Sequence, residues 1–391
     1  MKKTVISFLP AAFLCFAQAF AQQAADTAYR FTHGPYLQGL TPEGVHVYFT
    51  TSGRGVSAVE VRRKGTSAVR RVFSYTDGLV QANNTRNAIR LDSLEPNTAY
   101  EYRLSSVPIK KFRLSNNVYG DTVTTPWYGF RTLDPSATSC TFVTLSDMHD
   151  DAAKYGKLLS YMPLQEADAV FALGDMLSNF SRPDQPYPSF IDTSTVRFAR
   201  HIPFVAVRGN HETRGQYARL YGRYFYLPKG KFYATYQWGD TFFIVLDTGE
   251  DKPDGHIDYS RITAFDAYRR EQADWLRQVV RSDAFRQARH RIVLLHIPPV
   301  KRGANTRASA HGPAMVDSLY MPILNREKID LMIAGHLHEF MYREPEAGEN
   351  SFPILLNSNA SATLVRVSRE GVAVRTVDTE GKVIFEKMLE D

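Results

Sequence analysis

The chain has 391 residues, of which 43% are hydrophobic and 23% charged, a composition ordinary for a soluble globular protein of two or so domains. The formal net charge is +6, which falls to +4 without Lys2 and Lys3 and mildly favours anionic substrates. No basic run is dense enough to indicate nucleic-acid binding, so the charge pattern argues against that class of partner.

The chain begins like a secretory signal peptide. A basic start precedes an apolar run at residues 5–16, and Ala19-Phe20-Ala21 forms an A-x-A cleavage site. We therefore predict a signal peptide at residues 1–21, with export to the periplasm or out of the cell. The apolar run is too short for a comfortable membrane span, and no later segment is long and apolar enough to cross a membrane. We expect no membrane span in the mature chain.

Residues 31–132 have an all-β pattern. Apolar and polar residues alternate at 45–49 and again at 59–61, which we interpret as two half-buried strands. Further short strands are predicted around residues 89–91, 100–104 and 128–130. Such spacing is typical of a β-sandwich, and residues 94–100 resemble the corner of a fibronectin type III domain. We predict a fibronectin or immunoglobulin-like sandwich domain here.

After a linker, the pattern from residue 139 to residue 391 changes to apolar runs that alternate with helical segments. The predicted strands are 140–146, 168–174, 202–208, 241–247, 291–295 and 329–334. The predicted helices between them are 151–162, 188–200, 262–281 and 313–326. The tail from Ser351 returns to strand-like segments. The sequence therefore predicts a layered α/β domain with added antiparallel strands.

Five short polar clusters each follow one of these apolar runs. They contain Asp147 and His149; Asp175; Asn210, His211 and Glu212; His296; and His336 and His338. Strand ends in α/β sheets are where such folds place ligand sites. Carboxylates, an amide and several imidazoles that converge there predict a metal site. Taken alone, Asp175 could also cap a helix, and His296 could be a core histidine.

The spacing within two clusters supports a shared ion. Asp147 and His149 are two residues apart, and in an extended backbone such side chains point the same way. His336 and His338 repeat this spacing, and Gly335 beside them permits a close approach. We expect each pair to reach a metal ion.

Together the clusters resemble the five motifs of the calcineurin-like metallophosphoesterase superfamily, over roughly residues 140–345. With the sandwich in front, nearly the whole mature chain resembles the purple acid phosphatase-related branch. The resemblance implies a metallophosphoesterase β-sandwich flanked by helices, and it implies two metal ions that share Asp175. One ion would be held by Asp147, His149, Asp175 and His338, and the other by Asp175, Asn210, His296 and His336.

The resemblance also implies a mechanism. Two cations would lower the pKa of a bridging water, and the resulting hydroxide would attack phosphorus in line. His211 would stay off the metals and donate a proton to the leaving group, and Glu212 would orient His211 or support the site from behind. Arg208 and His311 are weaker candidates for substrate contact, and a structural salt bridge is an equal alternative for Arg208.

One departure from the purple enzymes concerns the metals. Their iron-binding tyrosine, three residues after the Gly-Asp aspartate, is replaced by Ser178 in this sequence. His149 stands where the purple enzymes usually have no metal-binding histidine, so it would replace that tyrosine. This favours a pair of divalent ions, manganese, zinc or iron, over a ferric centre.

We predict hydrolysis of a small phosphate monoester. The first alternative is a phosphodiesterase or nucleotide hydrolase on the same site, because the metal ligands are shared. The second is a non-catalytic surface binding protein with a structural metal site. The sequence indicates neither the substrate nor the oligomeric state.

Overall fold

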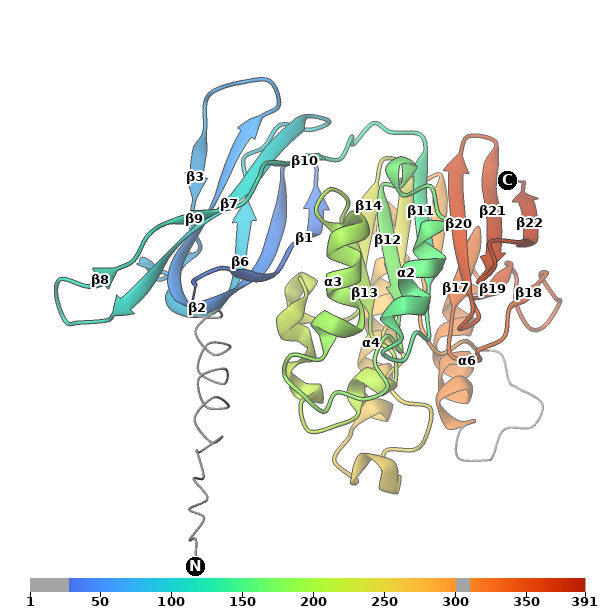
Figure 1. Ribbon diagram of the computed structural model, residues 1–391. Helices are drawn as coiled ribbons and strands as arrows, with labels where there is room; N and C mark the ends of the chain where they lie inside the picture. Colours follow the sequence, from blue (N-terminus) through green and yellow to red (C-terminus); the bar gives the residue numbers. More distant parts are fainter. Residues whose placement is uncertain (1–27, 300–309, 391) are drawn as a thin grey trace, which may run out of the picture.

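The computed structural model of the protein describes residues 28–299 and 310–390 (Figure 1). An all-β N-terminal part and an α/β C-terminal part lie next to one another. The predicted signal peptide at 1–21 lies outside the described residues. Within the described residues, no helix is both long enough and apolar enough to cross a membrane.

The N-terminal part is a β-sandwich, as the sequence predicted. Its longer strands are β1 (Phe31–Thr41), β2 (Gly44–Arg63), β6 (Ala82–Leu91), β7 (Ala99–Lys111) and β10 (Tyr128–Arg131). Short strands complete it: β3 (Arg70–Val72), β4 (Tyr75–Thr76), β5 (Leu79–Val80), β8 (Val118–Tyr119) and β9 (Val123–Thr124). Buried Val47, Phe49, Val61 and Tyr102 belong to its core.

The two strands predicted at 45–49 and 59–61 are halves of the single strand β2. Its first half pairs with β1 and β6, and its second half pairs with β3 and β7. The prediction of two strands was wrong because the alternating pattern breaks at residues 52–55, where β2 changes partners and its pairing with β6 shifts register.

The C-terminal part contains two six-stranded sheets. The first has the order β13 (Phe204–Val207), β12 (Ala169–Leu173), β11 (Cys140–Leu145), β20 (Ser361–Ser368), β21 (Gly371–Asp378), β22 (Val383–Leu389). The second has the order β14 (Ala234–Trp238), β15 (Thr241–Val245), β16 (His290–Leu294), β17 (Leu331–Ala334), β19 (Ile354–Leu356), β18 (Met341–Arg343). All six predicted strands are confirmed to within two residues, and the tail forms the predicted antiparallel strands.

The α-helices of the described residues are α2 (Ala152–Ser160), α3 (Asp192–Ser194), α4 (Phe265–Val279), α5 (Asp283–Gln287) and α6 (His311–Leu324). Short 3-10 turns lie at 164–166, 211–213, 218–224, 228–230 and 257–259. Three of the four predicted helices are confirmed by α2, α4 and α6. The fourth, predicted at 188–200, is α3 extended on both sides by π-helical turns at 187–191 and 195–199. These wider turns place Phe190 and Phe198 in the core.

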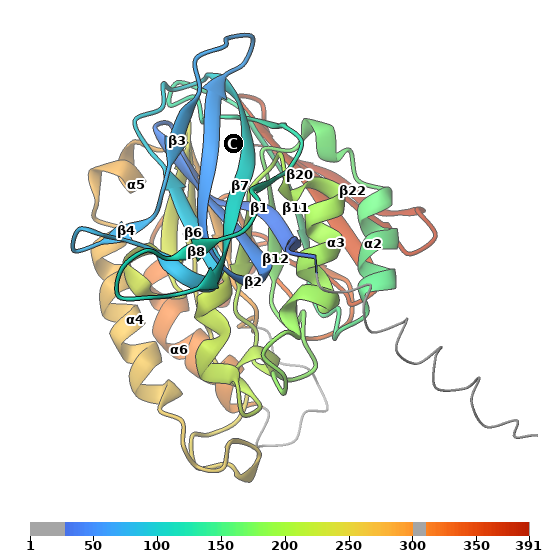
Figure 2. The same cartoon turned by 60° about the vertical axis from the view of Figure 1, so that its left-hand side comes forward.

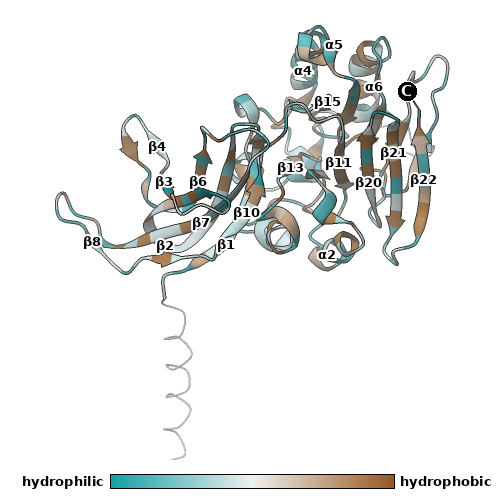
Figure 3. Ribbon diagram, turned by 90° about the horizontal axis from the view of Figure 1, so that it is seen from above, coloured by the Kyte–Doolittle hydropathy of each residue, from teal (hydrophilic) through white to brown (hydrophobic). Residues whose placement is uncertain are grey.

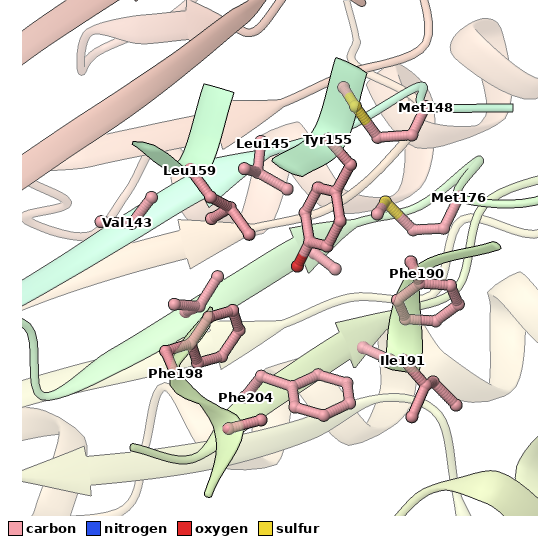
Figure 4. Packing of buried hydrophobic residues seen from close by; sticks show 14 of the residues in the cluster. Val143, Leu145, Met148, Tyr155, Leu159, Met176, Phe190, Ile191, Phe198 and Phe204 are labelled. Carbon is pink, nitrogen blue, oxygen red and sulfur yellow. The ribbon is translucent and has the colours of Figure 1, made fainter. Parts of the chain in front are cut away.

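Apolar side chains form three layers in this part. One layer lies between the two sheets, and a second lies between the second sheet and helices α4 and α6. The third lies between the first sheet and the segment from α2 to α3 (Figure 4). Viewed from above, β11, β20 and β21 carry stretches of brown, the colour of hydrophobic residues (Figure 3). The sheets therefore form a rigid support whose strand ends can hold a site.

The sandwich is joined to the third layer by side chains of β1. Tyr36 is 1% exposed and packs in the same cluster as Phe204 and Tyr224. Its hydroxyl donates to the Tyr224 carbonyl over 2.8 Å, and Gln38 accepts from the backbone of Tyr226 over 2.6 Å. The two parts thus share apolar core as well as hydrogen bonds.

Candidate metal centre

Strand ends bring the predicted metal-binding residues together. Strands β11, β12 and β13 pair in parallel, and so do β16 and β17 of the second sheet. Parallel strands end at the same edge of a sheet, so the segments after them lie side by side. The two sheets meet at this edge, where the ring Nδ1 of His296 donates to the Leu173 carbonyl over 2.7 Å. All seven predicted ligands lie in this one region.

The backbone at these residues is not extended. Five of the seven predicted ligands have φ between 50° and 74°: Asp147, His149, Asp175, His336 and His338. The reasoning from an extended i, i+2 pair was therefore wrong, although both side chains of each pair still reach the site. Residues other than glycine rarely adopt this region, and such strain is concentrated at functional sites. Backbone hydrogen bonds hold this conformation. The Asp147 amide donates to the Gly174 carbonyl and the His149 amide to the Asp175 carbonyl, each over 3.0 Å.

Asp147, His149 and His338 form the first group of potential metal ligands. The Nε2 atoms of the two histidines are 3.0 Å apart, and that of His338 is 3.4 Å from Asp147 Oδ1. This carboxylate oxygen is buried and has no hydrogen-bond partner among the described residues. Gly335 leaves the space for this approach, because a Cβ there would lie 2.7 Å from Asp147 Oδ2.

Asp175, His296 and His336 form the second group. His296 Nε2 lies 3.1 Å from Asp175 Oδ2, and both side chains are buried. Burial opposes a charge on His296, but the carboxylate of Asp175 raises its pKa to about 10. Burial lowers the pKa of His336 to about 4, so this ring is neutral at pH 7. Asp175 also belongs to a third group with His149 and His211, which places it between the first two.

The donor atoms in this region fit bound cations. Because Nδ1 of His296 donates to a carbonyl, its Nε2 in the neutral ring offers a lone pair toward Asp175 and Asn210. Asn210 Oδ1 also lies 3.1 Å from His336 Nδ1. Without a cation, the reversed amide satisfies more hydrogen bonds, since its nitrogen then donates to both rings. With a cation, the oxygen must face inward. The Nε2 of a neutral His296 and the Asn210 oxygen would face one another with lone pairs across 3.0 Å, a contact that either a proton on the ring or a metal ion satisfies.

Two further residues of the third cluster lie beside these groups. His211 Nδ1 donates to the Ser178 carbonyl over 2.6 Å, which leaves Nε2 to face the site, 3.8 Å from Asp175 Oδ2. Glu212 is fully buried and accepts from the backbone amides of Gly209, Asp175 and Leu177 over 2.8, 2.9 and 3.0 Å. Its hydrogen bonds therefore join the segments after β12 and β13, and the ring of His211 is oriented by Ser178. Burial raises the pKa of Glu212 to about 7.

Comparison with known proteins identifies this arrangement. A family model described as calcineurin-like phosphoesterase matches residues 140–340, which is more than half of the chain. The chain belongs to this family. Its members normally bind two metal ions, and the two ligand groups with Asp175 between them are compatible with that number. The protein is therefore a hydrolase with a phosphoesterase domain, as the resemblance implied.

Solved structures of phosphoesterases are similar over most of the chain. Purple acid phosphatase PPD1 from yellow lupin (Lupinus luteus) has a TM-score of 0.66 and 15% identity, covering 91% of this chain and 74% of the lupin chain. PhoD has a TM-score of 0.58 and 13% identity, covering 90% of this chain and 92% of its own. At such low identity the likeness shows the fold. No curated protein sequence matches the chain.

Arg214, which the sequence analysis did not single out, lies beside His211. Arg214 Nη1 lies 3.2 Å from His211 Nε2, and the same guanidinium binds Glu250 over 2.9 Å and Asp251 over 3.1 Å. Burial works to lower the pKa of Arg214, but the bond to Glu250 raises it, so the charge is kept. In the sequence, the only sign of this contact was a basic residue three positions after His211. The carboxylates that fix Arg214 belong to Glu250 and Asp251, which lie far from it along the chain.

The two predicted substrate contacts have other partners. Arg208 Nη2 binds the buried carboxylate of Asp247 over 2.5 Å, and its guanidinium stacks 4.1 Å from the centre of the Phe232 ring. His311 begins helix α6, and its Nε2 lies 2.7 Å from Asp266 Oδ1. These contacts match the salt-bridge alternative for Arg208. A substrate role for either side chain stays a prediction.

Proposed function

We propose that the protein hydrolyses monoesters of phosphate on small molecules. The observation that carries this proposal is the position of His211 Nε2, 3.8 Å from the Asp175 carboxylate that lies between the two ligand groups. A proton donor beside a dinuclear site suits the release of an alcohol leaving group. We further propose that residues 1–21 direct the protein to the periplasm or the medium.

The residues that would hold the metals are those of the two ligand groups. Asp147, His149 and His338 would bind one ion, Asn210, His296 and His336 the other, and Asp175 both. When bound, two divalent cations supply positive charge to the phosphate oxygens and lower the pKa of a water molecule. Manganese, zinc and iron all suit these oxygen and nitrogen donors.

The presence of Ser178 in place of a tyrosine is an argument for two divalent ions. Its hydroxyl donates to the His149 carbonyl over 3.1 Å, and its amide donates to Asp150 Oδ2 over 2.9 Å. Those bonds hold the segment that carries His149, whose imidazole would supply the ligand that a tyrosine supplies in the purple enzymes. A neutral imidazole in place of a phenolate favours the lower charge of a divalent ion.

His211 and Arg214 act on the substrate. Because Ser178 holds the Nδ1 proton of His211, Nε2 is the atom that donates to the leaving group. In the free site Nε2 accepts a hydrogen bond from Arg214, which Glu250 and Asp251 fix in place; when Nε2 carries the proton for the leaving group, this bond is given up and the Arg214 charge faces the phosphate instead. A monoester carries up to two negative charges on its terminal phosphate and a diester carries one, so this extra cation favours monoesters.

The test is turnover by metal-stripped protein that is reloaded separately with manganese, zinc and iron. An aryl phosphate monoester and the matching diester are assayed side by side, with metal content from elemental analysis. About two ions per chain with faster monoester turnover is the result we expect. Preference for the diester would select the diesterase alternative. Two bound ions with turnover of neither ester would contradict the proposal and favour the binding-protein alternative.

A further inference from the structure

A hairpin of the N-terminal sandwich carries exposed apolar side chains away from the rest of the molecule. Strand β7 continues past the sandwich core, turns at residues 112–117 and returns as β8 (Figure 1). Phe112 is 58% exposed, and Leu114, at the turn, is fully exposed. Tyr119 on the returning strand is 49% exposed. Figure 3 shows β8 at the end of the molecule farthest from β20–β22.

The same hairpin is strongly basic. Lys110, Lys111 and Arg113 are all exposed and adjoin Phe112 and Leu114 in the sequence. From Leu104 to Gly120 the sequence contains no acidic residue. None of the three cations lies in an ion pair with any carboxylate of the described residues, whereas Arg62 and Arg103 in the body of the sandwich are both paired.

The hairpin is built to keep these side chains in water. Ile109 pairs with Tyr119 and Lys111 with Val118, and Asn117 Oδ1 accepts from the Arg113 amide over 2.8 Å to close the turn. Phe112 and Leu114 lie beyond the last pair, in the turn, where their side chains are exposed. Hairpin β4–β5, at Tyr75–Val80, projects from the same part of the molecule (Figure 2) and exposes Leu79 to 75%.

We propose that the tip of the β7–β8 hairpin, residues 110–119, binds the surface of a lipid bilayer with anionic headgroups. Phe112 and Leu114 enter the boundary between headgroups and acyl chains, where an exposed apolar side chain leaves water. Lys110, Lys111 and Arg113 remain at the level of the headgroups, with their aliphatic stems against the lipid. Exposed apolar groups on a projecting tip, framed by unpaired cations, match such a surface in both polarity and charge.

Vesicle sedimentation tests this proposal on the exported full chain. Mass spectrometry first establishes where the chain begins, because an apolar leader left in place would bind lipid by itself. The wild type is mixed with vesicles of phosphatidylcholine alone and with vesicles rich in phosphatidylglycerol. We expect binding to the anionic vesicles that weakens as salt is raised.

Variants separate the two parts of the proposal. F112S/L114S should lower the partition into anionic vesicles by about 100-fold, roughly tenfold for each apolar side chain. Lys110→Glu with Lys111→Glu should lower it at least ~25-fold, about fivefold for each lysine. The matched controls are Val196→Ser in the π-helical turn at 195–199, whose side chain is 70% exposed, and the exposed Lys328→Glu, both of which should bind as the wild type does.

The proposal fails if the wild type does not sediment with anionic vesicles, or if F112S/L114S sediments with them as well as Val196→Ser does. It also fails if the wild type binds soluble heparin but not vesicles, since the partner would then be a dissolved polyanion. Turnover of a soluble phosphate ester and the circular dichroism spectrum, both unchanged in every variant, show that the fold and the site are intact.

Discussion

Gly209→Ala tests whether the packing behind the metal centre holds its geometry. A Cβ at Gly209 would lie 2.3 Å from both the backbone nitrogen and Oδ1 of Asp175, and 2.8 Å from Glu212 Oε2. Ordinary contact begins at 3.4 Å, so Asp175 would have to retreat by about 1.1 Å. A metal ligand tolerates a displacement of only about 0.2 Å. The substitution therefore displaces the carboxylate that both ions would share.

The magnitude follows from that displacement. Overpacking costs about 1–3 kcal/mol of folding stability, and a lost supporting bond reduces metal affinity by about 10- to 100-fold. We expect Gly209→Ala to lose metal during dialysis against a weak chelator and to unfold at a lower temperature in the metal-loaded state. Gly255→Ala is the matched control, because a Cβ there meets nothing within 4 Å. Equal metal content in the two variants would refute the reasoning.

Three further predictions concern single histidines. His211→Ala should retain both metals and lose about 10²- to 10⁴-fold in kcat, measured with metal content by elemental analysis; turnover at the wild-type rate would exclude the acid role. Asp175 raises the pKa of His296 to about 10, so a metal ion must displace a proton from this ring when it binds. Metal affinity, measured by competition with a chelator, should therefore rise about tenfold per pH unit from pH 6 to 8. An affinity that does not change with pH would contradict this prediction. Burial, with Arg90 nearby, lowers the pKa of His46 to about 4, so its contribution to stability is lost as pH falls from 6.5 to 4. After allowance for solvent screening, the free energy of unfolding should fall by ~1–2 kcal/mol over this pH range. Urea unfolding measures it. His46→Phe keeps the stacking on Tyr226 but has no imidazole to protonate, so its stability should not show this decrease.

The position of the candidate site could be predicted from the sequence because parallel strands impose it. Asp175 and Asn210 come directly after consecutive buried strands, and the loops at the carboxyl ends of such strands meet at one edge of the sheet. His296 is brought to the same place by the second sheet, which a local pattern indicates only as another strand end. Residue type and strand order were therefore sufficient to place the seven candidate ligands in one region, whereas their division between two ions came from the family resemblance.

The details that escaped prediction depend on contacts between distant segments. The left-handed backbone at His149 is held by a hydrogen bond to the carbonyl of Asp175, in the segment after β12. Because Asp175 is distant in the sequence, the residues around His149 alone do not reveal this bond. Arg214 is fixed by Glu250 and Asp251, more than thirty residues away. The buried bonds of Glu212 likewise join amides from two loops, so its place behind the site is evident only in the folded chain.

The apolar cluster that Tyr36 shares with Phe204 and Tyr224 bears on how the molecule comes apart. Each part of the chain covers aromatic rings of the other, so neither can lose its structure without uncovering them to water. Scanning calorimetry should accordingly record one cooperative heat-absorption peak for both parts. A truncated chain that starts at β11 would expose Phe204 and Tyr224 on its surface, and we expect it to aggregate during expression.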